Sequence, residues 1–450
     1  MKWQALNKDI RQRVDVAISA LNRQGIMCWA VGGIVRSMLD NSHSDDIDLC
    51  TKLPIDRVIQ LIGSTFKIVK VGASFGAIKV EIPDVGWVDV ATFRNKTVNG
   101  IDNDTADATI TSDSHRRDFT INAIYYAKGS TVDFHGGEDD LNNNILRCIG
   151  NPKERFEEDL LRVIRLFRFE ATMYATIDKQ TYTDAMNSNV VLEVQTDNKK
   201  GYAISTERIV SEFIKVFEND NANCELFLDR MWQLGIIQKL MPEFIGADTL
   251  LQNPKYHPEG DVWTHTKQVV QRSKGLTQRW IALFHDIGKP AAARIVNGHT
   301  HMYNTFHSHD KAGALMIPSI GRRLKFPNEL INLIQVCTRW HMYIRQAPPN
   351  PKNIRKLQFG MGKDSLPFLR SLAIADTSER DVTSFEIIDK FTSPLQESEL
   401  PISPILTGKI LIERGYKPSV TFGTILSRAY KHQIEENCTD IEELFNVGRE

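Results

Sequence analysis

Residues 31–50 read VGGIVRSMLDNSHSDDIDLC, a paired-glycine turn followed by a helix-length segment and then two aspartates one residue apart. On an extended strand, residues i and i+2 point to the same face, so Asp46 and Asp48 present two carboxylates side by side. Paired carboxylates are the hard oxygen ligands that Mg²⁺ prefers. Gly32 and Gly33 lack Cβ atoms and let the backbone approach a triphosphate closely. The combination favours nucleotidyl transfer, whereas an isolated Asp-x-Asp is more often a solvated turn or edge.

A third carboxylate follows in a similar setting. The run VGWVDVATFR, residues 85–94, alternates apolar and polar residues as a half-buried strand does, and it carries Asp89. Three carboxylates on neighbouring strands can hold two metal ions that polarise an attacking hydroxyl and bind the phosphates of a nucleoside triphosphate. The alternative is that Asp89 is a surface residue of an edge strand.

The segment SHRRDFTINAIYY, residues 114–126, interleaves polar and apolar positions. Its adjacent arginines, Arg116 and Arg117, have planar guanidinium groups that suit phosphate oxygens. Asn122 is a candidate contact to a ribose or a phosphate. The alternative for the two arginines is a solvated basic pair.

Five segments, in order, resemble the class II tRNA nucleotidyltransferases, the CCA-adding enzymes, of the bacterial type that carries a C-terminal HD phosphohydrolase domain. They cover most of residues 25–215, and the last 60 residues add a further similar stretch, ILTGKILIERGYKPSVTFGTIL. The five segments are VGGIVRSMLD with DDIDLCT, the strand ending in DVATFR, RRDFTINA, the GG-x-DDL turn with LRCIGNPKERFEEDLLRVIRLFRF, and STERIVSEF.

The resemblance implies a role for each matching residue. It makes Asp46 and Asp48 the ligands of catalytic Mg²⁺, with Asp89 as the third carboxylate. The residues implied to bind the nucleotide fall in three groups: Gly32, Gly33 and Arg36 for the triphosphate; Arg117, Asp118 and Asn122 for the ribose and phosphates; and Glu158, Asp159, Arg162 and Arg165 in the segment that reads the incoming base without a template.

The base-reading assignment has a physical rationale. On a continuous helix, Asp159 and Arg162 at i and i+3 share one face, and a carboxylate acceptor beside a guanidinium donor imitates a Watson–Crick edge. The apolar positions from Arg155 to Phe169 predict such a helix. The alternative is an ordinary intrahelical ion pair.

The second half of the chain carries a different set of ligands. Histidines and aspartates stand in HPEGDVWTHT, RWIALFHDIGKP, TFHSHDKAGA, RWHMYI and LAIADTSERD, all between residues 257 and 381. Imidazole and carboxylate together suit a transition metal such as Ni²⁺, Co²⁺ or Mn²⁺ better than Mg²⁺. The candidate ligands are His265, His285, Asp286 and Asp376, with His309 and His341 available for a second metal or for phosphate. The alternative is a degenerate HD fold that serves as an RNA-binding or dimerisation platform.

Composition bounds these hypotheses. The 55 Lys and Arg nearly balance the 56 Asp and Glu, and the net charge of −1 argues mildly against a nucleic-acid partner unless charges segregate. Positive charge is concentrated in segment 147–168, which is rich in arginine. Six cysteines without a CxxC, no secretory leader and no long apolar run predict a cytoplasmic protein without a membrane segment.

The predicted fold class is α+β. A nucleotidyltransferase head of the polymerase beta type, with a five-stranded or similar mixed sheet, is expected over residues 1–137. All-α neck and body follow over 138–253, an α-helical HD domain over 254–390, and a helical tail over 391–450, with breaks at 254–261 and 347–353.

The expected reaction is transfer of CMP twice and AMP once, from CTP and ATP, to the 3′ end of tRNA, by a monomer or homodimer. A metal-dependent phosphatase or 2′,3′-cyclic phosphodiesterase activity is implied for the HD domain. Three alternatives remain: a CC-adding, A-adding or poly(A)-polymerase relative; an HD phosphohydrolase whose head only holds RNA; and a nonenzymatic RNA-binding protein.

Overall fold

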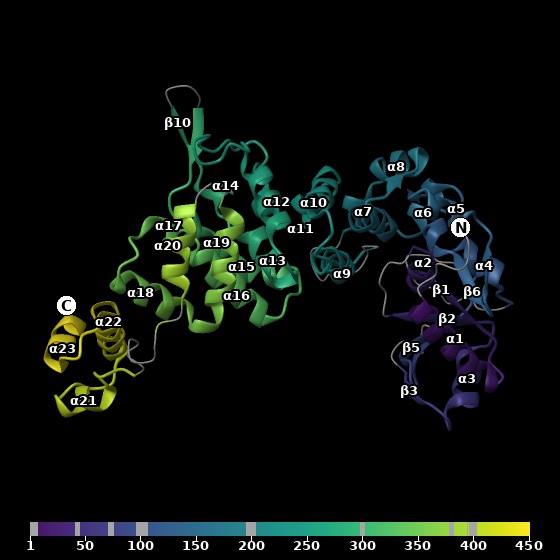
Figure 1. Ribbon diagram of the computed structural model, residues 1–450. Helices are drawn as coiled ribbons and strands as arrows, with labels where there is room; N and C mark the ends of the chain where they lie inside the picture. The colour runs from purple at the N-terminus through teal and green to yellow at the C-terminus, as the bar shows by residue number, and fades with distance from the viewer. Residues whose placement is uncertain are drawn as a thin grey trace. The chain divides into compact units, whose positions relative to one another are not determined.

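The computed structural model describes residues 8–40, 46–70, 76–95, 107–194, 204–297, 302–377, 382–393, 395 and 403–450 (Figure 1). The chain divides into two compact units. The first comprises Met1–Val216 with Asn221–Lys239, and the second comprises Phe217–Asp220 with Leu240–Glu450.

The first unit is built on a mixed seven-stranded sheet, where the sequence predicted a five-stranded or similar one. The strand order is β3-β4-β5-β2-β1-β6-β7. Strands β2 and β5 are parallel, and every other neighbouring pair is antiparallel. The strands are β1 (Cys28–Val31), β2 (Ile47–Thr51), β3 (Lys67–Val69), β4 (Ala77–Ile82), β5 (Gly86–Thr92), β6 (Ile124–Ala127) and β7 (Ser130–Asp133).

Alternation along the strands separates the core from the polar face. Ile47 and Leu49 of β2 and Val88 and Val90 of β5 are buried in one apolar cluster with residues of α1 (Lys8–Arg23), α2 (Gly33–Asp40) and α3 (Ile55–Ile62). The intervening residues of β2 and β5 therefore point to the opposite face of the sheet. The charged side chains of these two strands lie there.

The rest of the first unit is helical, with one short sheet that the sequence did not predict, β8 (Ile145–Leu146) beside β9 (Thr176–Ile177). Its helices are α4 (Ile110–His115), η3 (Thr120–Asn122), α5 (Gly137–Asn142), α6 (Pro152–Glu158), α7 (Leu161–Met173), α8 (Lys179–Met186), η4 (Val190–Glu193), α9 (Thr206–Phe217), α10 (Cys224–Gln233) and α11 (Ile236–Leu240).

The predicted continuous helix from Arg155 to Phe169 is wrong. Asp159 has extended backbone angles, φ −153° and ψ 98°, and ends α6. Its side chain accepts a hydrogen bond from the backbone N–H of Leu161 at 3.2 Å, at the start of α7. A short acidic side chain that binds nearby backbone competes with helix continuation, and here it separates the two helices.

The second unit is almost entirely helical, apart from an unpredicted hairpin of β10 (Arg294–Asn297) and β11 (Met302–Thr305). The break predicted at 347–353 covers the turn between α17 (Tyr343–Gln346) and α18 (Pro351–Met361). The helices are η5 (Pro242–Phe244), α12 (Val262–Arg272), α13 (Leu276–Phe284), α14 (Lys289–Ala292), α15 (His309–Arg323), α16 (Asn328–Trp340), α17 (Tyr343–Gln346), α18 (Pro351–Met361), η6 (Lys363–Ser365), α19 (Leu366–Asp376), α20 (Val382–Thr392), α21 (Gly408–Glu413), α22 (Val420–Glu436) and α23 (Ile441–Arg449).

The last three helices have a small core of their own, made by Leu406, Leu411, Ile425, Ala429, Leu444 and Phe445. Among the residues that the structure describes, no helix has the length and apolar character needed to cross a membrane.

Candidate active sites

The sheet of the first unit brings two of the predicted carboxylates side by side. Asp48 on β2 stands in register with Asp89 on the parallel neighbour β5. Asp89 is paired in turn with Lys79 on β4, whose Nζ donates to Asp89 Oδ2 at 2.9 Å. Asp46 lies directly before β2 and is exposed. Because β5 is an interior strand between β2 and β4, the alternative of an edge-strand Asp89 is wrong.

The electrostatics of this group fit a divalent cation. The pKa of Asp48 is raised to about 6, first because the protein around it desolvates the carboxylate and then because Asp89 and Asp46 add negative charge. Gly32 has φ +79°, and a Cβ there would stand 3.7 Å from Asp48 Oδ2. Crowded carboxylates beside a bare glycine form a cradle that Mg²⁺ and a phosphate can enter. When bound, Mg²⁺ would supply charge neutralisation for the phosphates and acidify a hydroxyl.

A second group of predicted residues converges on Asp118. Asp118 Oδ1 accepts from the backbone N–H of Phe119 and from Asn122 Nδ2, both at 2.8 Å, and Oδ2 accepts from Arg165 Nε at 2.8 Å. Burial opposes ionisation of Asp118, but Arg165 and the two hydrogen bonds outweigh it and hold the pKa of the carboxyl well below its usual range. Arg36, on α2, donates to Asn122 Oδ1.

Arg36 also belongs to a cationic cluster around one aromatic ring. Its guanidinium lies 5.0 Å from the centroid of the Phe169 ring, and those of Arg165 and Arg168 lie 5.8 and 3.8 Å from it. Burial and then the charge of Arg168 lower the pKa of Arg36 to about 10. Cations crowded in this way are suited to a polyanion such as a triphosphate.

The adjacent arginines of the first unit are not a solvated pair, so that alternative is wrong. Arg116 Nε donates to Asp113 Oδ1 at 2.7 Å, and Arg117 donates to Asp113 Oδ2 at 3.0 Å. Asp113 is buried, and the hydroxyl of Tyr125 donates to it at 2.7 Å. This carboxylate fixes the direction of both guanidinium groups.

The two predicted base-reading residues have different partners. Asp159 Oδ2 accepts from Arg208 of α9 at 2.9 Å. Arg162, only 5% exposed, donates to Glu158 Oε2 at 3.0 Å and to the carbonyl oxygens of Arg155 and Arg116 at 2.8 Å each. The expected face shared by Asp159 and Arg162 on one helix is therefore wrong, as is the alternative of an ion pair between them.

Helix α9 supplies two residues that the sequence interpretation missed. Besides Arg208, it carries Glu212, which is 3% exposed and lies 2.5 Å from Arg168 Nε and 3.9 Å from Arg165 NH1. Both residues occur in the quoted segment STERIVSEF, but nothing in its spacing indicates the arginines of α7 and the aspartate before it, which lie 40 or more residues earlier; Glu212 also accepts from Lys215 on its own helix at 2.8 Å.

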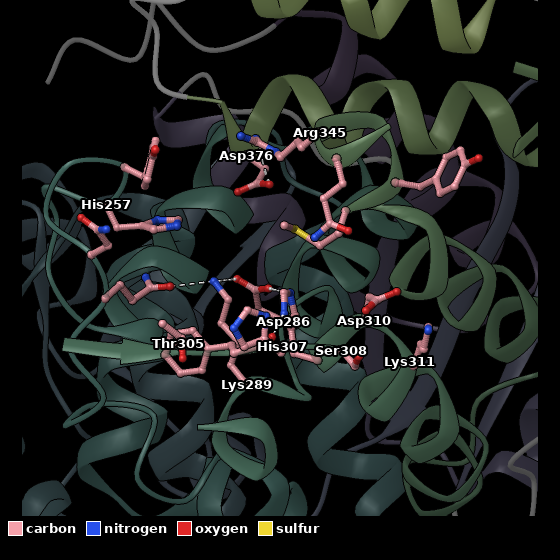
Figure 2. A pocket seen from close by; sticks show the side chains of 18 of the residues that line it. His257, Asp286, Lys289, Thr305, His307, Ser308, Asp310, Lys311, Arg345 and Asp376 are labelled. Carbon is pink, nitrogen blue, oxygen red and sulfur yellow. Dashed lines mark hydrogen bonds and ion pairs between the residues drawn. The ribbon is translucent and has the colours of Figure 1, made fainter. Parts of the chain in front are cut away.

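In the second unit, all six predicted ligands of the HD type lie together, with Asp286 at their centre. Asp286 and Asp376 are labelled in Figure 2. The distances from Asp286 to the Nε2 atoms of the histidines are 3.0 Å for His285, 3.1 Å for His309, 3.5 Å for His341 and 3.6 Å for His265. Asp376 Oδ1 lies 2.9 Å from His265 Nε2. Asp286 thus stands between a set with His265, His285 and Asp376 and a set with His309 and His341.

The hydrogen bonds of the rings aim lone pairs at this centre. The Nδ1 atoms of His285, His309 and His341 donate to backbone carbonyls at 2.7, 2.7 and 2.8 Å, so in the neutral rings Nε2 is the acceptor. His309 Nε2 and His341 Nε2 nevertheless face each other at 3.2 Å. Converging acceptors need a cation between them, and this is the arrangement of metal-ligating histidines.

Two further observations fit a metal. Within the described ranges, the buried Nε2 atoms of His265 and His285 make no well-aligned hydrogen bond, although carboxylate oxygens lie 2.9 and 3.0 Å away. Burial of Asp286 favours its neutral form, but His285 and then Lys289 outweigh it and hold the pKa of Asp286 well below its usual value.

The neighbours of these ligands were not predicted. Glu259 Oε1 accepts from His265 Nδ1 at 2.6 Å and from His257 Nδ1 at 3.0 Å, which orients His265. Lys289 Nζ lies 2.6 Å from Asp286 Oδ2, an ion pair drawn in Figure 2. The signals available were the glutamate of HPEGD and the lysine of HDIGK, each close in sequence to a predicted ligand.

The cluster opens into a cavity of about 750 Å³ within the second unit. Its wall combines cationic and aromatic side chains, among them Lys311, Arg339, Arg345, Tyr303 and Trp340. Cations and aromatic rings around a ligand cluster suit a substrate that carries both a phosphate and a flat ring.

Three family models match separate stretches of the chain. A family model described as the poly A polymerase head domain matches residues 28–147, the probable RNA and SrmB-binding site of polymerase A matches 203–247, and the HD domain matches 262–381. A multifunctional CCA protein of Pasteurella multocida is 28% identical over 310 residues, 65% of this chain and 70% of that protein.

The chain is thus similar to bacterial CCA-adding enzymes that carry an HD domain. A CCA-adding enzyme of Enterococcus faecalis is 33% identical over 221 residues, which are 48% of this chain and 51% of that enzyme. The chain thus spans about half the length of that relative. The solved structure of the Bacillus stearothermophilus CCA-adding enzyme in complex with CTP matches with a TM-score of 0.59 and 19% identity over 96% of this chain and 95% of that one, which supports the fold.

Proposed function

We propose that this protein adds the sequence CCA to the 3′ end of tRNA, taking CMP from CTP twice and AMP from ATP once. The observation that carries the proposal is the register pairing of Asp48 with Asp89 beside Gly32, near the N-terminal end of β2, where Asp46 also lies. The similarity to CCA-adding enzymes supports the choice of tRNA as acceptor.

In this proposal each predicted residue has a task set by its contacts. Asp46, Asp48 and Asp89 hold Mg²⁺, and Gly32 and Gly33 let the triphosphate approach the start of α2. Arg36, Asn122, Asp118 and Arg165 form one hydrogen-bonded set that positions ribose and phosphates. Arg117 is held by Asp113 and keeps further N–H donors for phosphate oxygens.

Base selection rests on Asp159 in this proposal, and Arg162 positions it. Cytosine and adenine share an exocyclic amino group, whereas uracil and guanine present a carbonyl oxygen at the corresponding place. A carboxylate accepts from the amino group and repels the carbonyl. Arg162, which binds two carbonyl oxygens and Glu158, fixes the junction of α6 and α7 from which Asp159 projects.

We further propose that the second unit is a metal-dependent phosphohydrolase acting on phosphomonoesters or 2′,3′-cyclic phosphates. The converging Nε2 atoms around Asp286 carry this proposal, against the alternative of an inert HD platform. His265, His285, Asp286 and Asp376 would hold one ion of the Ni²⁺, Co²⁺ or Mn²⁺ type, and Asp286, His309 and His341 a second. Such ions supply Lewis acidity and lower the pKa of a bound water.

Paired variants test both activities in one preparation. Asp46→Ala and Asp48→Ala should abolish nucleotide addition and keep phosphohydrolysis, while Asp56→Ala, an exposed carboxylate on α3, should change neither. His285→Ala and His309→Ala should do the reverse. Near wild-type tRNA extension by either carboxylate variant would refute the metal assignment in the head, and no hydrolysis by wild type with any of the three metals would leave the second unit a platform.

A further inference from the structure

A third cluster of metal-ligand side chains lies on the last two helices of the chain. His432 is on α22, Cys438 is in the connection after it, and Glu443 is in the first turn of α23. One ligand atom from each residue lies within 4.8 Å of the other two. His432 Nε2 is 2.8 Å from Glu443 Oε1. The cluster shares no residue with the two candidate active sites.

The local backbone directs these side chains toward one point. Helix α22 ends at Asn437, which has left-handed angles with φ 54°. Two residues after Cys438, Asp440 caps α23 by accepting from the backbone N–H groups of Glu442 at 2.7 Å and Glu443 at 3.2 Å. Within this connection the Cys438 thiol donates to the backbone carbonyl of Asp440 at 3.7 Å.

Cys438 differs from the other cysteines of the chain. All six lie within the described residues, and the other five are buried, whereas Cys438 is partly exposed. A partly exposed thiol beside an imidazole and a carboxylate is accessible to an ion from solvent. The buried five have no such access.

The small core of helices α21 to α23 gives a bound ion a structural task. Six buried apolar residues make this core, and seven partly buried ones, Cys438 among them, pack against it. A core of that size stabilises a fold weakly, and small modules commonly add a metal or a disulfide, or pack against a neighbour. The neighbour here is α18, from which Arg355 donates to the carbonyl oxygens of Ile434 and Glu435 at 3.0 and 3.1 Å. That contact holds the end of α22, and α23 packs on α22 through Leu444 and Phe445.

We propose that His432, Cys438 and Glu443 bind one divalent ion of the Zn²⁺ type, which fastens α23 to the end of α22. A thiolate, an imidazole and a carboxylate form a borderline-soft donor set that suits Zn²⁺ or Co²⁺ and disfavours Mg²⁺. Three protein ligands leave the fourth tetrahedral position to water. On binding, the thiol of Cys438 loses its proton to solvent, and His432 and Glu443 exchange their mutual contact for the ion.

The thiolate provides a signal that the other sites lack. The candidate ligands of the HD cluster and of the head are histidines and carboxylates only. Co²⁺ bound to a thiolate gives a near-ultraviolet charge-transfer absorption, so this band reports on Cys438 even when Co²⁺ also fills the HD cluster.

The experiment titrates Co²⁺ into the full chain after removal of metals by a chelator. The wild type should develop the thiolate band with one equivalent bound at this site, and Zn²⁺ should displace it. Cys438→Ser should abolish the band, and His432→Ala should bind Co²⁺ about tenfold or more weakly, as judged by the band. His309→Ala, matched in chemistry but located in the HD cluster, should keep it.

Two results would overturn the proposal. One is a wild-type protein without the band at saturating Co²⁺; the other is a band that persists in Cys438→Ser. Far-ultraviolet circular dichroism of each variant shows whether it remains folded. Cys438→Ser replaces sulfur by oxygen at a partly exposed side chain that packs against the small core, and His432→Ala gives a second route if that variant unfolds.

Discussion

The contact between Arg208 and Asp159 makes a quantitative prediction about base choice. Asp159 carries the proposed acceptor carboxylate, and Arg208 holds one of its oxygens at 2.9 Å from a different helix. Arg208→Met keeps much of the aliphatic stem and removes the guanidinium. The carboxylate then loses the partner that fixes its direction, although it keeps its bond from the backbone N–H of Leu161.

The size of the effect follows from the exposure of the pair. Unit charges about 4 Å apart interact by about 4 kcal/mol at an effective dielectric constant near 20. The Arg208 side chain is 34% exposed and that of Asp159 is 12% exposed, so solvent screening leaves about 1 kcal/mol. That is a factor of about five in the preference for CTP over UTP and for ATP over GTP. Asp159→Ala, which removes the acceptor itself, should cost about 1–3 kcal/mol of discrimination.

The assay is single-turnover nucleotide addition to tRNA with each of the four triphosphates, giving kcat/KM ratios. Arg230→Met is a matched control, because Arg230 makes an ion pair of the same length, 2.9 Å, with Glu170 in the same unit. It should lower stability without changing the ratios. Unchanged ratios in a folded Arg208→Met variant, or an equal change in the control, would refute a positioning role for Arg208.

Three further predictions concern stability and metals. Gly288→Ala should destabilise the second unit by about 2–4 kcal/mol in thermal unfolding, since the new Cβ would stand 2.1 Å from the His309 carbonyl oxygen; full stability would contradict the packing. Asp118→Asn should destabilise the first unit at neutral pH by about 2 kcal/mol. The folded pKa of Asp118 is depressed, so this contribution is present above the unfolded pKa of about 3.9 and fades as pH falls below it; a difference in melting temperature that does not shrink in acid would show another cause. Chelation followed by Mg²⁺ alone should restore nucleotide addition and leave phosphohydrolysis absent until a transition metal is supplied; equal restoration of both by Mg²⁺ would contradict the two donor sets.

Local sequence patterns were sufficient to predict the strands of the head and the segments that carry the histidine and aspartate ligands. Alternating residues in β2 and β5 indicated strands whose polar positions, Asp48 and Asp89, share a face, and the structure pairs them. The histidine and aspartate segments of the second unit likewise indicated a ligand set, and the residues converge on Asp286. In both cases the chemistry of the residue type limits the partners that it can have.

Long-range partners account for what the sequence did not reveal. The apolar periodicity from Arg155 to Phe169 favours one helix, but Asp159 binds backbone locally and pairs with Arg208, 49 residues later. A continuous helix would have to give up these interactions of Asp159. That ion pair depends on tertiary geometry, which periodicity does not contain. The case of Arg116 and Arg117 is different, because Asp113 lies only three and four residues before them; what the sequence did not show is that Asp113 is buried and holds both guanidinium groups.

The central claim is tested most directly by the length and sequence of the product made on tRNA transcripts that lack CCA, CA or A. The purified wild type with Mg²⁺ should add two C residues from CTP alone, complete CCA with CTP and ATP together, and then stop. Asp48→Asn should add nothing to any of the three transcripts. Long homopolymer tails, addition of only C or only A, or extension that survives in Asp48→Asn would contradict the account.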